Sequence, residues 1–273
     1  MKRKIFAVSD IHGDYDALIH GLLEAGYDEN NKKHLLVVLG DNFDRGSQSL
    51  DVYNYLKKLT DEGKAVVIMG NHDLMFIDYL TGECITPFNY MHNGENETFA
   101  EFLHQTAPFE MYCLLHGIDD KEVTYGDFAE WVSDAREEIN NEYPELLPWL
   151  QNLPYYYETK NYIFTHGAID TEANNWKEPH IIKYSYTDWQ ALTWDDGSFF
   201  SKPIINTDKT VVIGHFGTMH LRDMYDLSYE DGKKSDILTR DDGRVIAIDA
   251  TTIATHRVNV LVVEDELLWN MYY

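Results

Sequence analysis

The 273-residue sequence has few cysteines and no long apolar run, and each shortage excludes a class of protein. Its two cysteines, Cys84 and Cys113, lack CxxC spacing and are too few for a disulfide framework. No window approaches the roughly 18 to 20 consecutive apolar residues that a membrane span needs. The start, MKRKIFAVSD, has too short an apolar part for a secretory signal peptide. We therefore expect a cytoplasmic protein that does not enter a membrane.

Basic residues are also scarce, since 22 Lys and Arg stand against 47 Asp and Glu, which gives a formal net charge of −25. Such a balance disfavours binding to a nucleic-acid duplex, because phosphate contacts require a basic footprint. An anionic substrate must be attracted by local positive charge rather than by the overall field. Hydrophobic residues make up 44% of the chain, enough for a substantial core, and we expect one domain over residues 1–273.

The first 73 residues repeat one pattern three times, in which an apolar run ends abruptly in a polar cluster. The runs and clusters are 5–8 before SDIHG, 35–39 before GDNFDRG, and 65–69 before GNHD. Apolar residues at helical spacing predict helices between them, at 14–25 and 47–62. Alternating strands and helices predict a parallel sheet, in which sites form beyond the carboxyl ends of the strands.

The strand signal fades from residue 74 to about 153, where aromatic and acidic residues are frequent. Helical spacing occurs at 97–106 and 124–141, so we interpret 74–153 as a helical insertion packed beside the sheet. Residues 223–243 are predicted to form an exposed loop pair. The remaining strands are predicted at 162–165, 210–213, 245–248 and 258–263, and the first two of these end in THG and GHFG.

The stretch GDNFDRG at 40–46 places two carboxylates and an arginine at the mouth of a buried strand. Burying uncompensated charge costs several kcal/mol or more, so Asp41 and Asp44 need a stabilising partner. Ion pairing with Arg45, helix capping and a metal ion are the three candidates.

Six strand-end residues carry groups that can bind metal. Carboxylate, imidazole and amide oxygen without thiolate suit Mn, Fe or Zn. Six groups are too many for one ion with open positions, but they suit two ions about 3.5–4 Å apart, as in phosphoryl transfer. Any one of these motifs alone is more often a turn or a structural histidine, so the hypothesis depends on their joint occurrence. The six are Asp10, His12, Asp41, Asn71, His166 and His215.

These motifs resemble those of the calcineurin-like metallophosphoesterases, most closely their phosphoprotein phosphatase (serine/threonine phosphatase) branch. The resemblance implies an α/β fold, an αββα sandwich of two mixed sheets flanked by helices, with the insertion at about 74–153. The matching stretches are DIHG from Asp10, GDNFDRG from Gly40, GNHD from Gly70, THG from Thr165 and GH at 214–215.

The resemblance also implies a ligand set for two divalent transition-metal ions, with Mn²⁺ expected and Fe or Zn as alternatives. Asp10, His12 and Asp41 would hold one ion. Asp41 would bridge to the second ion, which would be completed by Asn71, His166 and His215. A hydroxide between the ions would attack phosphorus in line, because two cations lower the pKa of bound water.

Three further residues have implied roles in catalysis. His72 resembles the general acid of the family, and Asp44 resembles the carboxylate that fixes its tautomer. Arg45 would grip phosphate oxygens with its planar fork, which Lys could not reproduce.

Two departures from the branch concern the substrate. A second phosphate-gripping arginine is expected shortly after a tryptophan, but the comparable stretch, LTWDDG at 192–197, has acids there. Lys183, Arg222 or Lys202 could substitute. The motif ending in Asp73 also resembles that of the symmetrical diadenosine tetraphosphate hydrolases. The leading hypothesis is hydrolysis of phosphomonoesters, either a phosphorylated protein or a small phosphate ester. The alternatives are a dinucleoside polyphosphate hydrolase and a catalytically inactive metal-binding regulator.

Overall fold

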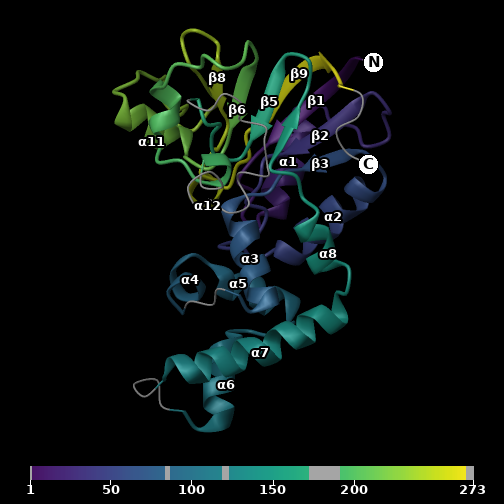
Figure 1. The fold of residues 1–273 in the computed structure, drawn as a ribbon, viewed down its shortest axis with the longest axis vertical. Helices are drawn as coiled ribbons and strands as arrows, with labels where there is room; N and C mark the ends of the chain where they lie inside the picture. Colours follow the sequence, from purple (N-terminus) through teal and green to yellow (C-terminus); the bar gives the residue numbers. More distant parts are fainter. Residues whose placement is uncertain (1, 84–86, 119–122, 172–190, 269–273) are drawn as a thin grey trace.

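Two β-sheets face each other in the upper half of the computed structural model, which describes residues 2–83, 87–118, 123–171 and 191–268 (Figure 1). The first sheet has the strand order β3-β2-β1-β9, and the second has the order β4-β5-β6-β8-β7. The strands are β1 (Lys2–Val8), β2 (His34–Val38), β3 (Ala65–Val67), β4 (Tyr156–Glu158), β5 (Tyr162–Thr165), β6 (Thr210–Ile213), β7 (Leu238–Thr239), β8 (Val245–Ala247) and β9 (Leu261–Glu266).

Both sheets are mixed. Strands β1, β2 and β3 run parallel, as do β5, β6 and β8, whereas β9, β4 and β7 pair antiparallel with their neighbours at the edges. Alternation along β1 separates two cores, because successive side chains point to opposite faces. Ile5 and Ala7 join the layer between the sheets, while Phe6 and Val8 pack outward. The predicted sandwich of two mixed sheets is confirmed.

Helices cover the outer face of each sheet. Leu18 of α1 (Tyr15–Glu24) and Leu56 of α2 (Ser49–Asp61) share the core with the outward side of β1 and β2. Leu221 of α11 (Thr218–Met224) and Phe199 of the 3₁₀ helix η1 (Ser198–Ser201) pack on the second sheet. The short helix α12 (Thr252–Thr255) follows β8. These layers confirm the predicted helical flanks.

The insertion is helical, as predicted, and projects from the sandwich along the long axis of the molecule (Figure 1). Its aromatic residues form its core, where Tyr90, Phe99 and Trp131 are buried against one another. Its helices are α3 (Asn71–Thr81), α4 (Pro87–His92), α5 (Glu95–Phe102), α6 (Pro108–His116), α7 (Tyr125–Glu142) and α8 (Leu146–Gln151). The single-domain organisation of 1–273 stays a prediction.

The sequence-based strand predictions were wrong at three places. Residues 223–243 were predicted to be loop, but α11 extends to Met224 and β7 lies at 238–239, paired with β8. The last strand covers 261–266 rather than 258–263. Strand β4 was not predicted, because its two tyrosines were interpreted as packing residues. All three strands lie at sheet edges. With three and two residues, β4 and β7 are too short to carry an apolar pattern, and β9 alternates half-buried with exposed residues over most of its length.

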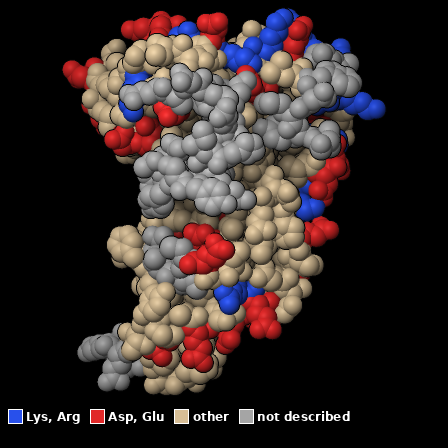
Figure 2. All heavy atoms as spheres, viewed as in Figure 1, with Lys and Arg blue, Asp and Glu red and all other residues tan. Residues whose placement is uncertain are grey.

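Acidic side chains are spread over both parts of the molecule on the face in Figure 2, whereas Lys and Arg gather mainly at the end of the sandwich far from the insertion. Among the helices of the described ranges, none is long and apolar enough to cross a bilayer. The free Cys113 is buried, and Cys84 lies outside the described residues. The cytoplasmic location stays a prediction.

Candidate metal centre and catalytic site

The polar clusters at the strand ends meet at one edge of the two sheets. Backbone hydrogen bonds tie the loops together: Asp10 donates to Gly40 at 3.1 Å, and His12 donates to Asp41 at 3.0 Å. In the second sheet, Gly214 donates to the carbonyl of His166 at 2.8 Å. The carboxyl ends of parallel strands lie at the same edge, so the loops after β1, β2, β5 and β6 deliver their side chains to one place.

Left-handed backbone is concentrated in these loops. Six of the eleven non-glycine residues with positive φ in the described ranges are candidate site residues. Such conformations cost about 1–3 kcal/mol each and persist where the surroundings over-determine them, which is typical of functional sites. The six are Asp10, His12, Asp41, Asp44, Arg45 and His215.

One group of side chains gathers around His166. Its Nδ1–H donates to the carbonyl of Leu39 at 2.6 Å, which leaves Nε2 as the nitrogen facing the site. This Nε2 lies 3.0 Å from Oδ1 of Asn71, 3.2 Å from Nδ1 of His215 and 3.3 Å from Oδ1 of Asp41. When His166 is neutral, Nε2 and these oxygens are all acceptors, and a cation shared among them would satisfy all of them. The donor set therefore fits a divalent transition metal.

A second group shares Asp41. Nδ1–H of His12 donates to the carbonyl of Phe43 at 3.0 Å, and Nε2 lies 3.6 Å from Oδ2 of Asp41. His12, Asp41 and His72 can bring ligand atoms within 4.8 Å of one another, and so can Asp41, His166 and His215. Asp41 is thus common to two groups that could each hold a metal ion.

Asp10 lies at the same edge but outside these two groups. Its Oδ2 accepts from the backbone N–H of His215 at 2.9 Å, and the hydroxyl of Ser9 also donates to it. Burial and the carboxylate of Asp249 raise the pKa of Asp10 well above its usual value. The structure brings all six predicted ligands to one buried edge, with Asp10 turned toward the loop after β6.

The predicted acid pair lies beside this centre. Nδ1 of His72 is 2.7 Å from Oδ2 of Asp44, and both side chains are buried. The guanidinium of Arg45 donates from Nη2 to Nε2 of His72 at 2.8 Å and from Nη1 to Nε2 of His12 at 2.9 Å. His72 therefore has one ring nitrogen held by the carboxylate of Asp44 and the other hydrogen-bonded to Arg45.

Charge packing controls protonation at the centre. Burial lowers the pKa of His166, but the adjacent Asp41 carboxylate outweighs it and raises this pKa to about 10. Burial and His166 together lower the pKa of His215 to about 3. Burial opposes ionisation of Asp41, yet His166 and His72 hold its pKa well below its usual value. Burial also opposes the charged form of His72, whereas Asp41 and Asp44 raise its pKa.

Asp73 has a structural position that the motif did not reveal. Its Oδ2 accepts from the backbone N–H groups of Gly70 at 2.8 Å and Asp41 at 3.1 Å. Its Oδ1 accepts from the backbone of Asn42 at 3.2 Å and from Nδ2 of that residue at 3.0 Å. The carboxylate is completely buried and ties the loop after β2 to the start of α3. Asp73 thus fixes the geometry of these two loops.

Sequence reasoning missed three buried residues of the site. Asp249 follows β8 and is buried, and burial raises its pKa to about 6. The strand-end pattern could have identified it, because it comes one residue after the predicted strand 245–248. Thr98 and Glu95 lie on α5 of the insertion, and the hydroxyl of Thr98 bonds to Asp44 at 2.6 Å. No local motif marked these two.

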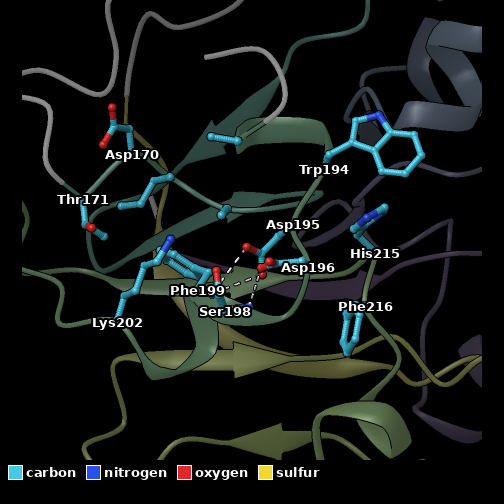
Figure 3. Close-up of a pocket in the computed structure, with 13 residues that line it drawn as sticks. Asp170, Thr171, Trp194, Asp195, Asp196, Ser198, Phe199, Lys202, His215 and Phe216 are labelled. Carbon is cyan, nitrogen blue, oxygen red and sulfur yellow. Dashed lines mark hydrogen bonds between the residues drawn. The ribbon is translucent and has the colours of Figure 1, made fainter. Parts of the chain in front are cut away.

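A cavity of about 870 Å³ opens beside His215 (Figure 3). Trp194, His215 and Phe216 line one side, and Lys202 lies on the opposite side. The indole of Trp194 meets the His215 ring edge-on, with centroids 5.1 Å apart. The cavity therefore joins an aromatic wall to a candidate metal ligand.

The acids that replace the expected second arginine cap a turn. Asp195 accepts from the backbone N–H of Phe199, and Asp196 accepts from that of Ser198, so both support η1. Arg222 donates from its Nη atoms to the carbonyls of Lys234, Asp236 and Ile237 and does not line the cavity beside His215. Lys202 lines the cavity, and Lys183 lies outside the described residues.

The fold is a two-sheet sandwich, and its buried histidines and aspartates form two groups that could hold metal ions. The family model of the calcineurin-like phosphoesterases matches residues 3–226, so the chain belongs to that family. The family prediction made from the motifs is confirmed.

Curated relatives carry two kinds of name. Shewanella-like protein phosphatase 1 of Plasmodium berghei is 31% identical over 61% of this chain and 39% of its own length. The asymmetrical bis(5'-nucleosyl)-tetraphosphatase of Bacillus velezensis is 33% identical over 41% of this chain and 52% of its own. The chain thus spans about half or less of the relatives that it matches.

Solved structures agree on the fold. A cold-active protein tyrosine phosphatase has a TM-score of 0.53 at 16% identity, covering 95% of this chain and 73% of its own. The form from a Shewanella species has a TM-score of 0.52 at 16% identity, with 97% and 80% covered. At such identities the likeness shows the fold alone.

Proposed function

We propose that the chain is a two-metal phosphoesterase that hydrolyses phosphomonoesters in the manner of a serine/threonine phosphatase. The observation that carries this proposal is the convergence of candidate ligand atoms around Asp41, directly beside the His72–Asp44 pair and Arg45. Its substrate would be a phosphorylated protein or a small phosphate ester.

Asp10, His12 and Asp41 would hold one cation, and Asp41, Asn71, His166 and His215 would hold the other. Mn²⁺ is the expected ion at both positions, with Fe or Zn as alternatives. Two bound cations supply an activated water and neutralise phosphate charge in an in-line displacement. Asp41 carries the anionic charge shared by both positions, and Nδ1 contacts to Phe43 and Leu39 orient the imidazoles of His12 and His166.

The remaining residues act on the phosphate and on the leaving oxygen. Arg45 would grip two phosphate oxygens with its planar fork. When it does so, its guanidinium leaves Nε2 of His72, which can then carry the proton for the leaving oxygen. Asp44 holds the other ring nitrogen and stabilises the imidazolium. Arg45 thereby couples phosphate binding to the availability of the acid.

A substrate panel with and without chelator tests this function. Purified protein should hydrolyse p-nitrophenyl phosphate and a phosphoserine peptide with added Mn²⁺, and EDTA should abolish both activities. Metal-dependent turnover on neither monoester would contradict the proposal.

The cavity beside His215 favours one second candidate, hydrolysis of dinucleoside polyphosphates. Trp194 and Phe216 offer aromatic faces on which a nucleobase could stack. Rates on diadenosine tetraphosphate and on the phosphoserine peptide, at equal Mn²⁺, separate the candidates. Trp194→Ala should depress only the dinucleotide rate if the base binds there. Exposed Tyr229→Ala is the control.

A further inference from the structure

Helix α5 of the insertion places a threonine hydroxyl against the carboxylate that orients His72. The hydroxyl of Thr98 donates to Oδ1 of Asp44 at 2.6 Å, and its oxygen accepts from the backbone N–H of Asp44 at 2.9 Å. The other carboxylate oxygen, Oδ2, is the one that lies 2.7 Å from Nδ1 of His72. Thr98 and Asp44 are both completely buried. One hydroxyl therefore fixes both the backbone and the carboxylate of Asp44.

The turn that carries Asp44 needs such support. Asp44 and Arg45 have φ values of 73° and 71°, in the left-handed region that non-glycine residues rarely adopt. The start of α5 holds the same turn, because the backbone N–H of Arg45 donates to the carbonyl of Gly94 at 3.1 Å. The hydroxyl of Ser49, on α2, lies 3.4 Å from the hydroxyl oxygen of Thr98. The insertion thus holds the Asp44–Arg45 turn through Thr98 of α5 and through Gly94, the residue that precedes this helix.

We propose that Thr98 is a positioning residue for acid catalysis, which makes the helical insertion part of the catalytic machinery. Thr98 touches neither substrate nor metal ligand in this role but acts through Asp44 and His72. The proposal rests on the phosphomonoesterase function given above. Holding Oδ1 leaves Oδ2 aimed at Nδ1 of His72, so that Nε2 keeps its direction toward the leaving oxygen.

The step that depends on this geometry is protonation of the leaving group. As the P–O bond breaks, its electron pair stays on the leaving oxygen, which takes the proton from Nε2 of His72. Water supplies the oxygen that remains on phosphate, and a proton from that water restores His72. A nitrophenolate leaves without a proton, whereas a serine alkoxide requires one. The two substrates therefore report differently on His72.

Thr98→Val removes the hydroxyl while keeping the shape of the side chain. We expect kcat on the phosphoserine peptide to fall about 10- to 100-fold, because a general acid contributes about 10²- to 10⁴-fold. On p-nitrophenyl phosphate we expect a loss below about 3-fold. Thr98→Ser should restore the peptide rate. The matched control is Thr81→Val, because the hydroxyl of Thr81 donates within α3, to the carbonyl of Ile77. This variant should change neither rate.

A double-mutant cycle tests whether Thr98 acts through His72. Adding Thr98→Val to His72→Asn should cost little further kcat on the peptide, since residues that act as a unit are not additive. Equal losses on both substrates, or a full further loss in the double variant, would overturn the proposal. Melting temperatures confirm folding, and Thr98→Ala replaces Thr98→Val if the latter unfolds.

A spectroscopic measurement keeps the inference separate from the proposed function. In Zn²⁺-loaded protein, the proton between His72 and Asp44 should give a downfield ¹H resonance that disappears in His72→Asn. Thr98→Val should shift this resonance upfield or speed its exchange with water, and an unchanged resonance would overturn the positioning role. If the wild-type protein hydrolyses no phosphomonoester, the proposed function fails, and this resonance alone decides the role of Thr98.

Discussion

The strand-end loops of the sandwich and helix α5 of the insertion reach the same buried acids, but they contribute different things. The loops deliver candidate ligand atoms that converge on Asp41, such as Nε2 of His166 at 3.3 Å. Helix α5 delivers a donor, the Thr98 hydroxyl, and a close backbone contact to Arg45. The loops therefore account for cation binding, while α5 accounts for the orientation of the acid. Substitutions in the two regions should separate metal content from catalytic geometry.

The largest effect is expected in the loops. Asp41→Asn keeps the Oδ1 acceptor for the N–H of His72, at 3.0 Å in the wild type, but removes the charge shared by both groups. We expect kcat to fall by at least about 100-fold and bound metal to drop below two equivalents, because even outer-shell changes cost about 10- to 100-fold. Elemental analysis and p-nitrophenyl phosphate kinetics measure the two quantities.

The control for Asp41 is another buried carboxylate in the sandwich. Asp265 of β9 accepts from the hydroxyl of Thr159 and from Asn161, and takes no part in the two groups. Asp265→Asn should lower stability while leaving metal content and kcat unchanged. If both variants lost metal equally, the loss in Asp41→Asn would come from destabilised folding and not from the missing ligand charge.

The next largest effect is expected from a substitution that disturbs the contact between Gly94, at the start of α5, and Arg45 in the turn. Gly94 has φ +91, and a Cβ there would lie 2.7 Å from Cα and 2.8 Å from Cγ of Arg45. Gly94→Ala should destabilise the protein by about 2–4 kcal/mol, from left-handed strain plus the clash, and should reduce activity while metal stays bound. Denaturant unfolding and kinetics measure both.

Gly117 provides a matched comparison within the insertion. It has φ +69 at the end of α6, and nothing lies within 4 Å of a Cβ built there. Gly117→Ala should cost about 1–2 kcal/mol and leave activity intact. If the two variants proved equally destabilised and equally active, the contact between Gly94 and Arg45 would be irrelevant to the site.

The smallest effect concerns Glu95, a completely buried carboxyl whose two oxygens have no hydrogen-bond partner among other described side chains and backbone groups. Burial and the charge of Asp44 raise the pKa of Glu95 from 4.5 to about 8. The folded state binds this proton more tightly than the unfolded state, so its contribution to stability falls as pH rises from about 4.5 to 8.

At pH 5 the Glu95→Gln variant should therefore have about the same free energy of unfolding as wild type. At pH 8 it should be more stable than wild type by about 1–3 kcal/mol. Urea unfolding at the two pH values measures the difference, and exposed Glu130→Gln on α7 is the control. A difference between the Gln variant and wild type that does not change with pH would contradict the buried, protonated carboxyl.

The strands and the loop residues could be predicted because both depend on local pattern. Apolar runs such as 35–39 identify buried strands, and Asp41 or His166 directly after such a run is placed by the common edge of parallel strands. Thr98 could not be predicted, since it lies 54 residues from Asp44 and meets it only through packing of the insertion. The edge strands β4 and β7 were not predicted, because three and two residues are too few to show a periodicity.

The role of Asp73 also shows the difference between what local sequence pattern predicts and what only the folded structure reveals. Its motif was interpreted as a substrate signal, yet only the folded loops show that its oxygens accept from Gly70, Asp41 and Asn42. The motif therefore predicted that Asp73 lies at the site, but not which groups its carboxylate bonds.

The central claim is tested most directly by titrating metal-free protein with Mn²⁺ while following p-nitrophenyl phosphate hydrolysis. With two cations held around Asp41, activity should rise from zero and reach its plateau at two equivalents per chain, and EDTA should reverse it. Activity that is absent at every Mn²⁺ concentration, or that is present and unchanged without added metal and with EDTA, would contradict a two-metal phosphoesterase.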